Sequence, residues 1–285
     1  MSNTVLNLEI NRKTMTMDGK ASGDAVYKIT SLEGLSASDI ELNLVANGQD
    51  HGSRMAGRRV TERTITIEGR YRGKREQDAI REEMIAFFNP LHTGTLTVQQ
   101  GDITRKIDFV VSGFEIKQKG AQMAYQAILT CAKPFFRDAS EYAENMAGRT
   151  PMIHAPLAFT SVGLVSSIKK FKQEMAITNY GHKETGIRIE IVARGAVVKP
   201  RLDNLTTGEY IKVNVTMATG DVLLINTNKG ETDITLNGVG VNNKKDRQSR
   251  YFKLLEGVNT LKYNADEGYI HMDVFPRYTA EYLGI

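Results

Sequence analysis

Residues 206–227 read TTGEYIKVNVTMATGDVLLINT, and the alternation of side chains in this stretch decides the fold class. Its first half carries an apolar side chain at every second position, namely at Ile211, Val213, Val215 and Met217. A period of two is typical of a β-strand with one buried face. Gly220 and Gly230 mark turns, and the alternation resumes at 222–225 and 234–236. The stretch predicts three consecutive strands of an antiparallel meander.

The first part of the chain carries the same pattern in several short runs. Alternating apolar residues predict strands at 6–10, 26–29, 40–44, 60–68, 96–98, 103–111 and 121–131. Between them, residues 74–88 have helical spacing, with one apolar stripe made by Ile80, Met84, Phe87 and Phe88. This stripe predicts a helix that lies on a sheet. The strand at 6–10 lacks the charged pattern that protects an exposed sheet edge, so we expect another chain to cover it.

The second part of the chain begins after a segment without any period. Residues 136–174 contain Pro151 and Pro156 and read as a linker with short elements. Beyond this segment, alternating runs predict strands at 176–180, 187–192, 197–205, 258–263 and 270–275. Closely spaced strands with turns between them and almost no helix favour a β-sandwich. We therefore expect a mainly β protein whose first domain carries the one helix.

Length, composition and charge exclude several classes of protein. A chain of 285 residues is typical of about two domains. No apolar run approaches the ~20 residues that span a bilayer, and the N-terminus lacks the apolar core of a signal peptide. We expect synthesis in the cytoplasm and no membrane insertion, and the single cysteine, Cys131, cannot form an internal disulfide. The net charge of +4 is too small to favour nucleic-acid binding as the main function.

Motifs that would carry catalysis or hold a cofactor are incomplete. The segment 69–74, GRYRGK, lacks the spacing of a phosphate-binding loop, and Arg75 stands where Ser or Thr would bind magnesium. The five histidines do not have the spacing of ligands on a helix, and Cys131 has no cysteine partner for a zinc site. We therefore expect no enzymatic activity, no catalytic residue, no metal site and no cofactor.

A basic, polar stretch follows the turn signal at Asn47-Gly48, and we interpret residues 49–59 as a long loop. It opens a basic cluster with the members Arg54, Arg58, Arg59, Arg63, Arg70, Arg72, Lys74 and Arg75. Three interpretations are open: solvated strand and loop ends, salt bridges to another subunit, or contacts with phosphate. A loop of this length between strands usually acts outside its own fold.

Several motifs resemble those of the siphophage distal tail proteins (the Dit family). In the second half they are the segment 207–231, the segment 249–259 and the terminal Tyr282-Leu283-Gly284-Ile285. In the first half they are Leu32-Glu33-Gly34-Leu35, Asp50-His51-Gly52, the strand at 63–69 and the segment 131–136. His51 splits the Asp-Gly pair that is usual in the family.

The resemblance implies a ring-forming, tail-tube-like β domain over residues 1–137, a linker over 138–174 and a galectin-like β-sandwich over 175–285. It implies a structural hub at the tail tip of a virion that infects a Gram-positive host. Such a hub forms a homohexameric ring with a central DNA channel and a peripheral platform. The expected ring interface comprises Asp50, Arg54, Arg58, Arg59 and Arg63. The expected partners are further copies of the chain, the tail tube protein, the tail-associated lysin or fibre protein, the receptor-binding proteins and DNA that passes without sequence-specific binding.

An alternative function is a glycan-binding module that attaches the virion to cell-wall saccharide. Galectin-like sandwiches can bind sugars through a groove that combines an aromatic platform with polar hydrogen-bonding groups. Tyr210, Tyr251 and Tyr263 are the aromatic residues available for this role, and the chain has no tryptophan.

Overall fold

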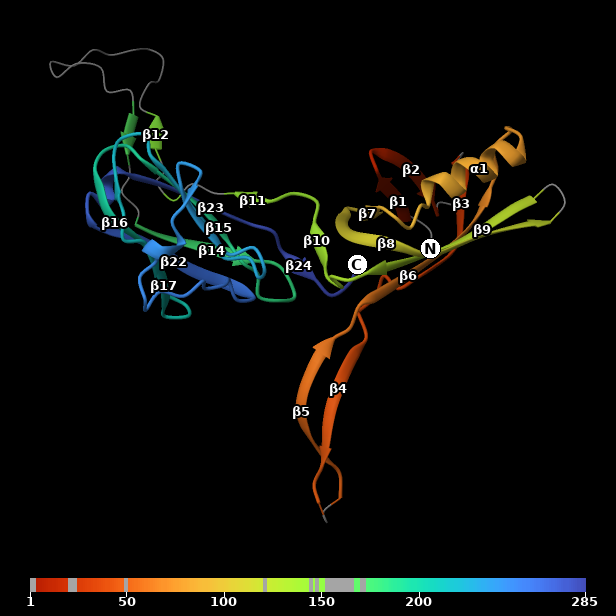
Figure 1. The fold of residues 1–285 in the computed structure, drawn as a ribbon, viewed down its shortest axis with the longest axis horizontal. Coiled ribbons are helices and arrows are strands. Elements are labelled where there is room, and N and C mark those ends of the chain that lie inside the picture. Colours follow the sequence, from red (N-terminus) through yellow and green to blue (C-terminus); the bar gives the residue numbers. More distant parts are fainter. Residues whose placement is uncertain are drawn as a thin grey trace. The chain divides into compact units, whose positions relative to one another are not determined.

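The computed structural model describes residues 4–19, 25–48, 51–119, 122–143, 146, 149–151, 167–169 and 173–285. The chain divides into two compact units (Figure 1). The first unit contains Met1–Ala139 together with Glu281–Ile285, and the second contains Ser140–Ala280. The second unit is therefore inserted into the chain of the first. The predicted first domain ends at residue 137 and the predicted second domain begins at residue 175 after a linker, whereas the second unit already begins at Ser140 and residues 281–285 return to the first unit.

Seven strands of the first unit form a closed, barrel-like sheet. They are β1 (Thr4–Ile10), β2 (Lys13–Asp18), β3 (Tyr27–Glu33), β6 (Arg63–Tyr71), β7 (Thr93–Gln100), β8 (Ile103–Lys119) and β9 (Gln122–Cys131). Neighbours follow the order β8-β7-β1-β2-β3-β6-β9, and β9 pairs again with β8. Because β1 pairs with β2 on one side and with β7 on the other, it is not an exposed edge. The expectation that another chain covers this strand is therefore wrong.

The long strand β8 closes the barrel by changing partner along its length. Its first part, up to Val110, pairs with β7, and its second part, from Val110 onward, pairs with β9. The register shifts between Val111 and Gly113, as in a β-bulge, which lets a strand bend sharply. The alternation in β9 is the one predicted, since Met123, Tyr125, Ala127, Leu129 and Cys131 are all buried.

The predicted helix is present as α1 (Gln77–Phe87). All four residues of its predicted stripe are buried, and the ring of Phe88 stacks on that of Phe114 with the centroids 4.4 Å apart. Two further strands extend the sheet at β8: β10 (Phe136–Asp138) pairs with β8, and β24 (Glu281–Tyr282) pairs with β10. No helix among the described residues is long and apolar enough to cross a membrane.

The second unit is a sandwich of two antiparallel sheets, as predicted. One sheet has the order β11-β23-β15-β19-β20-β21, and the other has the order β14-β22-β16-β17 with β18 paired to β16. The strands of the first sheet are β11 (Tyr142–Ala143), β15 (Arg188–Ala193), β19 (Val222–Asn226), β20 (Asp233–Leu236), β21 (Val239–Gly240) and β23 (Met272–Tyr278). Those of the second are β14 (Glu174–Asn179), β16 (Val197–Asn204), β17 (Glu209–Lys212), β18 (Thr216–Met217) and β22 (Gly257–Glu267). The shorter elements are a pair of strands, β12 (Arg149–Pro151) and β13 (Ser167–Lys169), and the 3-10 helices η1 (Asn242–Lys244) and η2 (Tyr269–His271).

The stretch that predicted a meander crosses from one sheet of the sandwich to the other. The strands β17 and β18 both pair with β16, whereas β19 pairs with β15 and β20 in the opposite sheet. The predicted meander is therefore wrong at its first pairing and correct at its second, since β19 pairs with β20. The predicted alternation is also correct, since Ile211, Val213 and Met217 are fully buried. Strands of both sheets point one face into the same core, so the period of two does not reveal which sheet a strand joins.

Candidate functional site: an exposed hairpin

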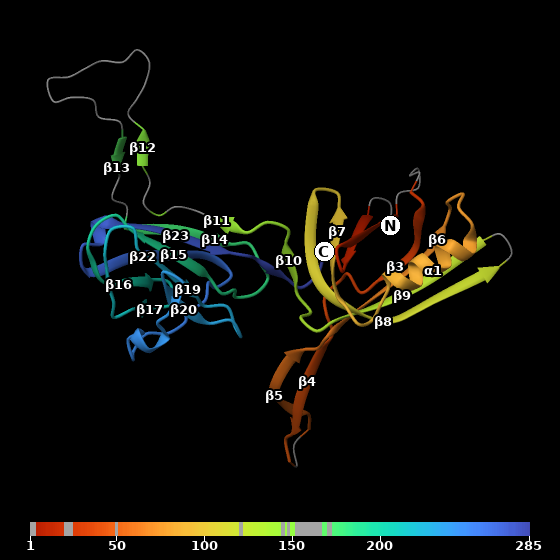
Figure 2. The same ribbon diagram turned by 45° about the horizontal axis from the view of Figure 1, so that its top comes forward.

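The segment after β3 forms a hairpin of its own in the first unit. The strands β4 (Ile40–Ala46) and β5 (Ser53–Val60) pair only with each other in the part of the chain that the structure describes. Figures 1 and 2 show this hairpin extending away from the barrel. We call it the arm, residues 40–60. The interpretation of residues 49–59 as a loop is therefore wrong from Ser53 onward, because a strand without a buried face has no apolar alternation to reveal it.

One face of the arm is apolar and exposed to solvent. Ile40, Leu42, Leu44 and Met55 lie on this face and are 55%, 52%, 55% and 55% exposed. Leu44 pairs with Met55, and Leu42 pairs with Arg58, which brings one cation to the same face. A two-stranded hairpin is marginally stable in water on its own, and a contiguous apolar face on a soluble domain marks an interaction site. The arm is therefore the candidate functional site of the first unit.

The opposite face of the arm is polar. Here Arg59 Nε donates to Glu41 Oε2 at 2.7 Å across the two strands. The next pair on this face is Asn43 with Gly57, and Val45 follows opposite Arg54. The ion pair is exposed to solvent and so contributes little to stability, but it gives Arg59 a partner within its own chain.

The predicted interface residues occupy three different environments. Asp50 lies outside the described residues. Arg54, Arg58 and Arg59 lie on the arm and are exposed, as the loop interpretation required. Because Arg58 and Arg59 are neighbours in a strand, their side chains point to opposite faces. Only Arg58 accompanies the apolar residues, whereas Arg54 and Arg59 share the polar face.

Arg63 differs from the other candidates, because it is only 3% exposed and lies inside the first unit. Its guanidinium donates hydrogen bonds to oxygens of its own chain, among them Pro134 O at 2.8 Å and Ser38 Oγ at 2.7 Å. Its assignment to an exposed ring interface is therefore corrected. The strand pattern contained the signal, since Arg63 shares its inward parity with Ile65 and Ile67, which are fully buried.

The apolar face of the arm was not predicted from the sequence. Residues 40–44 alternate like a half-buried strand, and the alternation hides the fact that no second layer covers them. The available signal was the neighbouring strand, where Arg54, Arg58 and Arg59 interrupt the apolar residues that a core would need.

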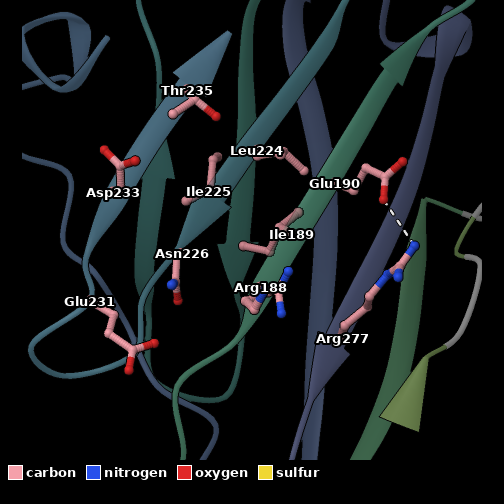
Figure 3. Close-up of a pocket in the computed structure, with 10 residues that line it drawn as sticks. All are labelled: Arg188, Ile189, Glu190, Leu224, Ile225, Asn226, Glu231, Asp233, Thr235 and Arg277. Carbon is pink, nitrogen blue, oxygen red and sulfur yellow. Dashed lines mark hydrogen bonds and ion pairs between the residues drawn. The ribbon is translucent and has the colours of Figure 1, made fainter. Parts of the chain in front are cut away.

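The second unit has a shallow groove of about 380 Å³ on the sheet that contains β15, β19, β20 and β23 (Figure 3). Arg188 and Arg277 lie opposite each other in register, and Arg277 Nη2 donates to Glu190 Oε2 at 2.9 Å. Glu231 and Asp233 lie at the other end, as Figure 3 shows. Leu224 and Ile225 contribute apolar side chains, but no aromatic residue lines the groove.

None of the three tyrosines proposed for a saccharide platform lines this groove. Tyr263 is fully buried in the core. The guanidinium of Arg201 stacks over the ring of Tyr210 with its carbon 3.8 Å from the centroid, and Tyr251 donates its hydroxyl to Asn242 Oδ1 at 3.3 Å. The groove therefore offers polar groups but not the aromatic face on which the glycan-binding alternative depended. Among the described residues, no cluster of His, Cys, Asp or Glu side chains has the arrangement of a metal site.

Comparison with known proteins gave consistent matches over both units. A family model described as the phage tail protein RIFT-related domain matches residues 25–129, and one described as the C-terminal domain of the siphovirus-type tail component matches residues 180–282. The crystal structure of the Dit protein of phage SPP1, described as a paradigm of the hub adsorption apparatus in phages that infect Gram-positive bacteria, is similar to this chain. The two are 12% identical with a TM-score of 0.71, over 97% of this chain and 99% of that one.

A chain of the phage P2 baseplate in its activated conformation with calcium also matches. It is 12% identical, with a TM-score of 0.48, over 97% of this chain and 98% of that one. A search of curated protein sequences gave no match.

Proposed function

Because the chain belongs to the siphophage distal tail protein family, we propose that it is the structural hub of a phage tail tip and closes into a homohexameric ring. In this function the barrels of six copies of the first unit surround a central channel for DNA. The second unit forms a peripheral platform for the partners of the tail tip. These partners are the tail tube protein, the tail-associated lysin or fibre protein and the receptor-binding proteins.

The observation that supports the ring most directly is the apolar face of the arm. Ile40, Leu42, Leu44 and Met55 are each more than half exposed, on a hairpin that the rest of the first unit does not cover. A head-to-tail contact repeated around a closed ring buries one such face per subunit. Burial of apolar area at about 25 cal/mol per Å² then supplies the driving force for association.

The positions of the charged residues support a contact in which Arg58 also takes part. Arg58 lies among the apolar residues, so it leaves water when the face is covered and needs a carboxylate or a carbonyl oxygen on the neighbouring subunit. Arg59 already has Glu41. The mechanism of the hub is geometric: it positions the channel and the platform without making or breaking a covalent bond.

The pair Leu44→Asp and Val45→Asp tests this function with a matched control. The two residues are neighbours in β4, are 55% and 44% exposed, and lie on opposite faces of the arm. Sedimentation velocity over a concentration series would measure the oligomeric state of each variant. We expect Leu44→Asp to remain a monomer, whereas Val45→Asp forms the same ring as the unmodified chain. Equal assembly of both variants would contradict the role of the apolar face, and a monomeric unmodified chain would contradict the ring.

A further inference from the structure

The guanidinium of Arg63 is a meeting point of four chain segments. An arginine side chain has five N–H groups, and all five donate hydrogen bonds here. The acceptors are Pro134 O, Gly34 O, Ser36 O, Ser38 Oγ and Leu283 O. None of them is a carboxylate, and burial lowers the pKa of the Arg63 guanidinium from its ordinary value. A buried cation that is held by neutral oxygens depends on every one of them, since each lost acceptor leaves an N–H group unpaired.

The two segments that connect the arm to the barrel both reach this guanidinium, and we call them the roots of the arm. Residues 34–38 lead into β4 and supply three of the five acceptors. On the other side, β5 ends at Val60, only three residues before Arg63 itself. The two roots are also joined directly, since the backbone N–H of Thr61 donates to Asp39 O at 3.1 Å. The direction in which the arm leaves the barrel is therefore set around Arg63.

The last residues of the chain bind at the same place. Leu283 O accepts from Arg63, Gly284 O accepts from Arg105, and the backbone N–H of Ile285 donates to Leu35 O at 3.0 Å. Tyr282 is clamped as well, because the Arg105 guanidinium carbon lies 3.5 Å from the centroid of its ring. The hydroxyl of Tyr282 donates to Asp138 Oδ2 at 2.9 Å, beside the pairing of β24 with β10.

Gly284 permits a close approach between the C-terminal residues 281–285 and the root of the arm at Leu35 and Ser36. A Cβ atom at this position would lie 2.8 Å from Ser36 C and 2.9 Å from Leu35 O, both of which are backbone atoms. A side chain of any size would therefore push the tail away from residues 35–36. Gly240 offers a matched comparison, because a Cβ atom built there meets nothing within 4 Å.

We propose that the C-terminal residues 281–285 act as a latch that fixes the root of the arm. Residues 281–285 supply one of the five acceptors of Arg63, and the backbone N–H of Ile285 donates to Leu35 O in the segment that leads into β4. The chain of the second unit connects β10 to β24, so it enters the first unit again at Glu281, the first residue of the latch. The latch thereby couples the second unit to the direction of the arm. The latch itself does not depend on the proposed ring. Only an effect of the latch on ring assembly would rest on that proposed function.

Hydrogen exchange of the dilute, monomeric protein tests the latch separately from the ring. We would compare the full chain with a truncation after Tyr282 and with Gly284→Ala, and we would use Gly240→Ala as the matched glycine control. In both tail variants we expect the amides of residues 34–39 and 61–64 to exchange roughly tenfold faster or more. The amides of β1 and β7 should keep their protection, and Gly240→Ala should match the full chain.

Two outcomes would overturn the latch. The first is unchanged exchange of residues 34–39 and 61–64 in the truncated chain while β1 and β7 stay protected. If the truncation unfolds the barrel, Gly284→Ala decides, and unchanged exchange at the root of the arm or at residues 281–285 overturns the proposal. In the full chain, assembly into rings would be measured in parallel. A latch that responds as expected in a chain that never forms rings would leave the latch standing and contradict the proposed function alone.

Discussion

Two adjacent arginines of the arm, Arg58 and Arg59, have opposite surroundings and should respond differently to the same substitution. Arg58→Glu places an anion on the apolar face, whereas Arg59→Glu places a second carboxylate opposite Glu41 on the polar face. We expect Arg58→Glu to weaken the ring by about 1.5–7 kcal/mol per interface, the range of a close interfacial charge pair. Arg59→Glu should leave assembly nearly unchanged, and sedimentation equilibrium would measure both. Weakening by Arg59→Glu alone would reverse our assignment of the two faces.

Cys131 provides a prediction on the pH dependence of stability. Burial raises the pKa of this thiol from 9.0 to about 12. Between these values the unfolded chain loses the thiol proton while the folded chain keeps it, so stability is fully present below pH 9 and is lost as the pH rises toward 12. Urea unfolding at several pH values should show that Cys131→Ala declines less steeply above pH 9 than the unmodified chain. Parallel declines would show that the thiol ionises equally in both states.

At the scale of the secondary-structure elements, the arm should be separable from the barrel that carries it. We would replace residues 41–59 with Asn-Gly, which can close a tight turn between Ile40 and Val60. Exposed side chains contribute little to folding, so the melting temperature should change by less than about 4 °C, while assembly is lost. Circular dichroism melting and sedimentation would measure the two effects. A large loss of thermal stability would mean that the arm is part of the fold of the first unit.

The elements that the sequence predicts well are those with one buried face. Ile80, Met84, Phe87 and Phe88 identify α1, and the alternation from Met123 to Cys131 identifies β9, because burial on one side imposes the period. The pairing of strands is not contained in that period. The segment around Thr216 and Leu223 changes sheets, and β8 changes partner in mid-strand, without any sign in the local pattern.

The candidate site was predicted only in part, for the same physical reason. The basic stretch after Asn47 correctly drew attention to residues 54–59, but charge alone does not separate a solvated arginine from a buried one. Arg58 is exposed and Arg63 is buried, although both were grouped in one cluster. The contacts of Arg63 with Ser38 and Leu283 join residues far apart in the chain, so no local pattern could reveal them.

At the scale of the whole chain, the insertion of the second unit predicts how the protein behaves once it is cut. A specific protease site inserted between Ala158 and Phe159 would produce two fragments. These should remain together in native buffer, because β10 pairs with β24 and β11 pairs with β23 across the cut. Size-exclusion chromatography with denaturing gels of each fraction would measure this. A cut chain that also ends at Ala280 is the matched control, and it should separate more readily.

In the proposed function, copies of the whole chain close into a ring through the apolar face of the arm. Electron microscopy of the purified protein, carried to a resolution that traces the arm, tests this claim most directly. We expect a closed ring of six subunits around a central channel, with Leu42 and Leu44 of each subunit covered by its neighbour. Single particles at every concentration, or a ring in which these two side chains face solvent, would contradict it.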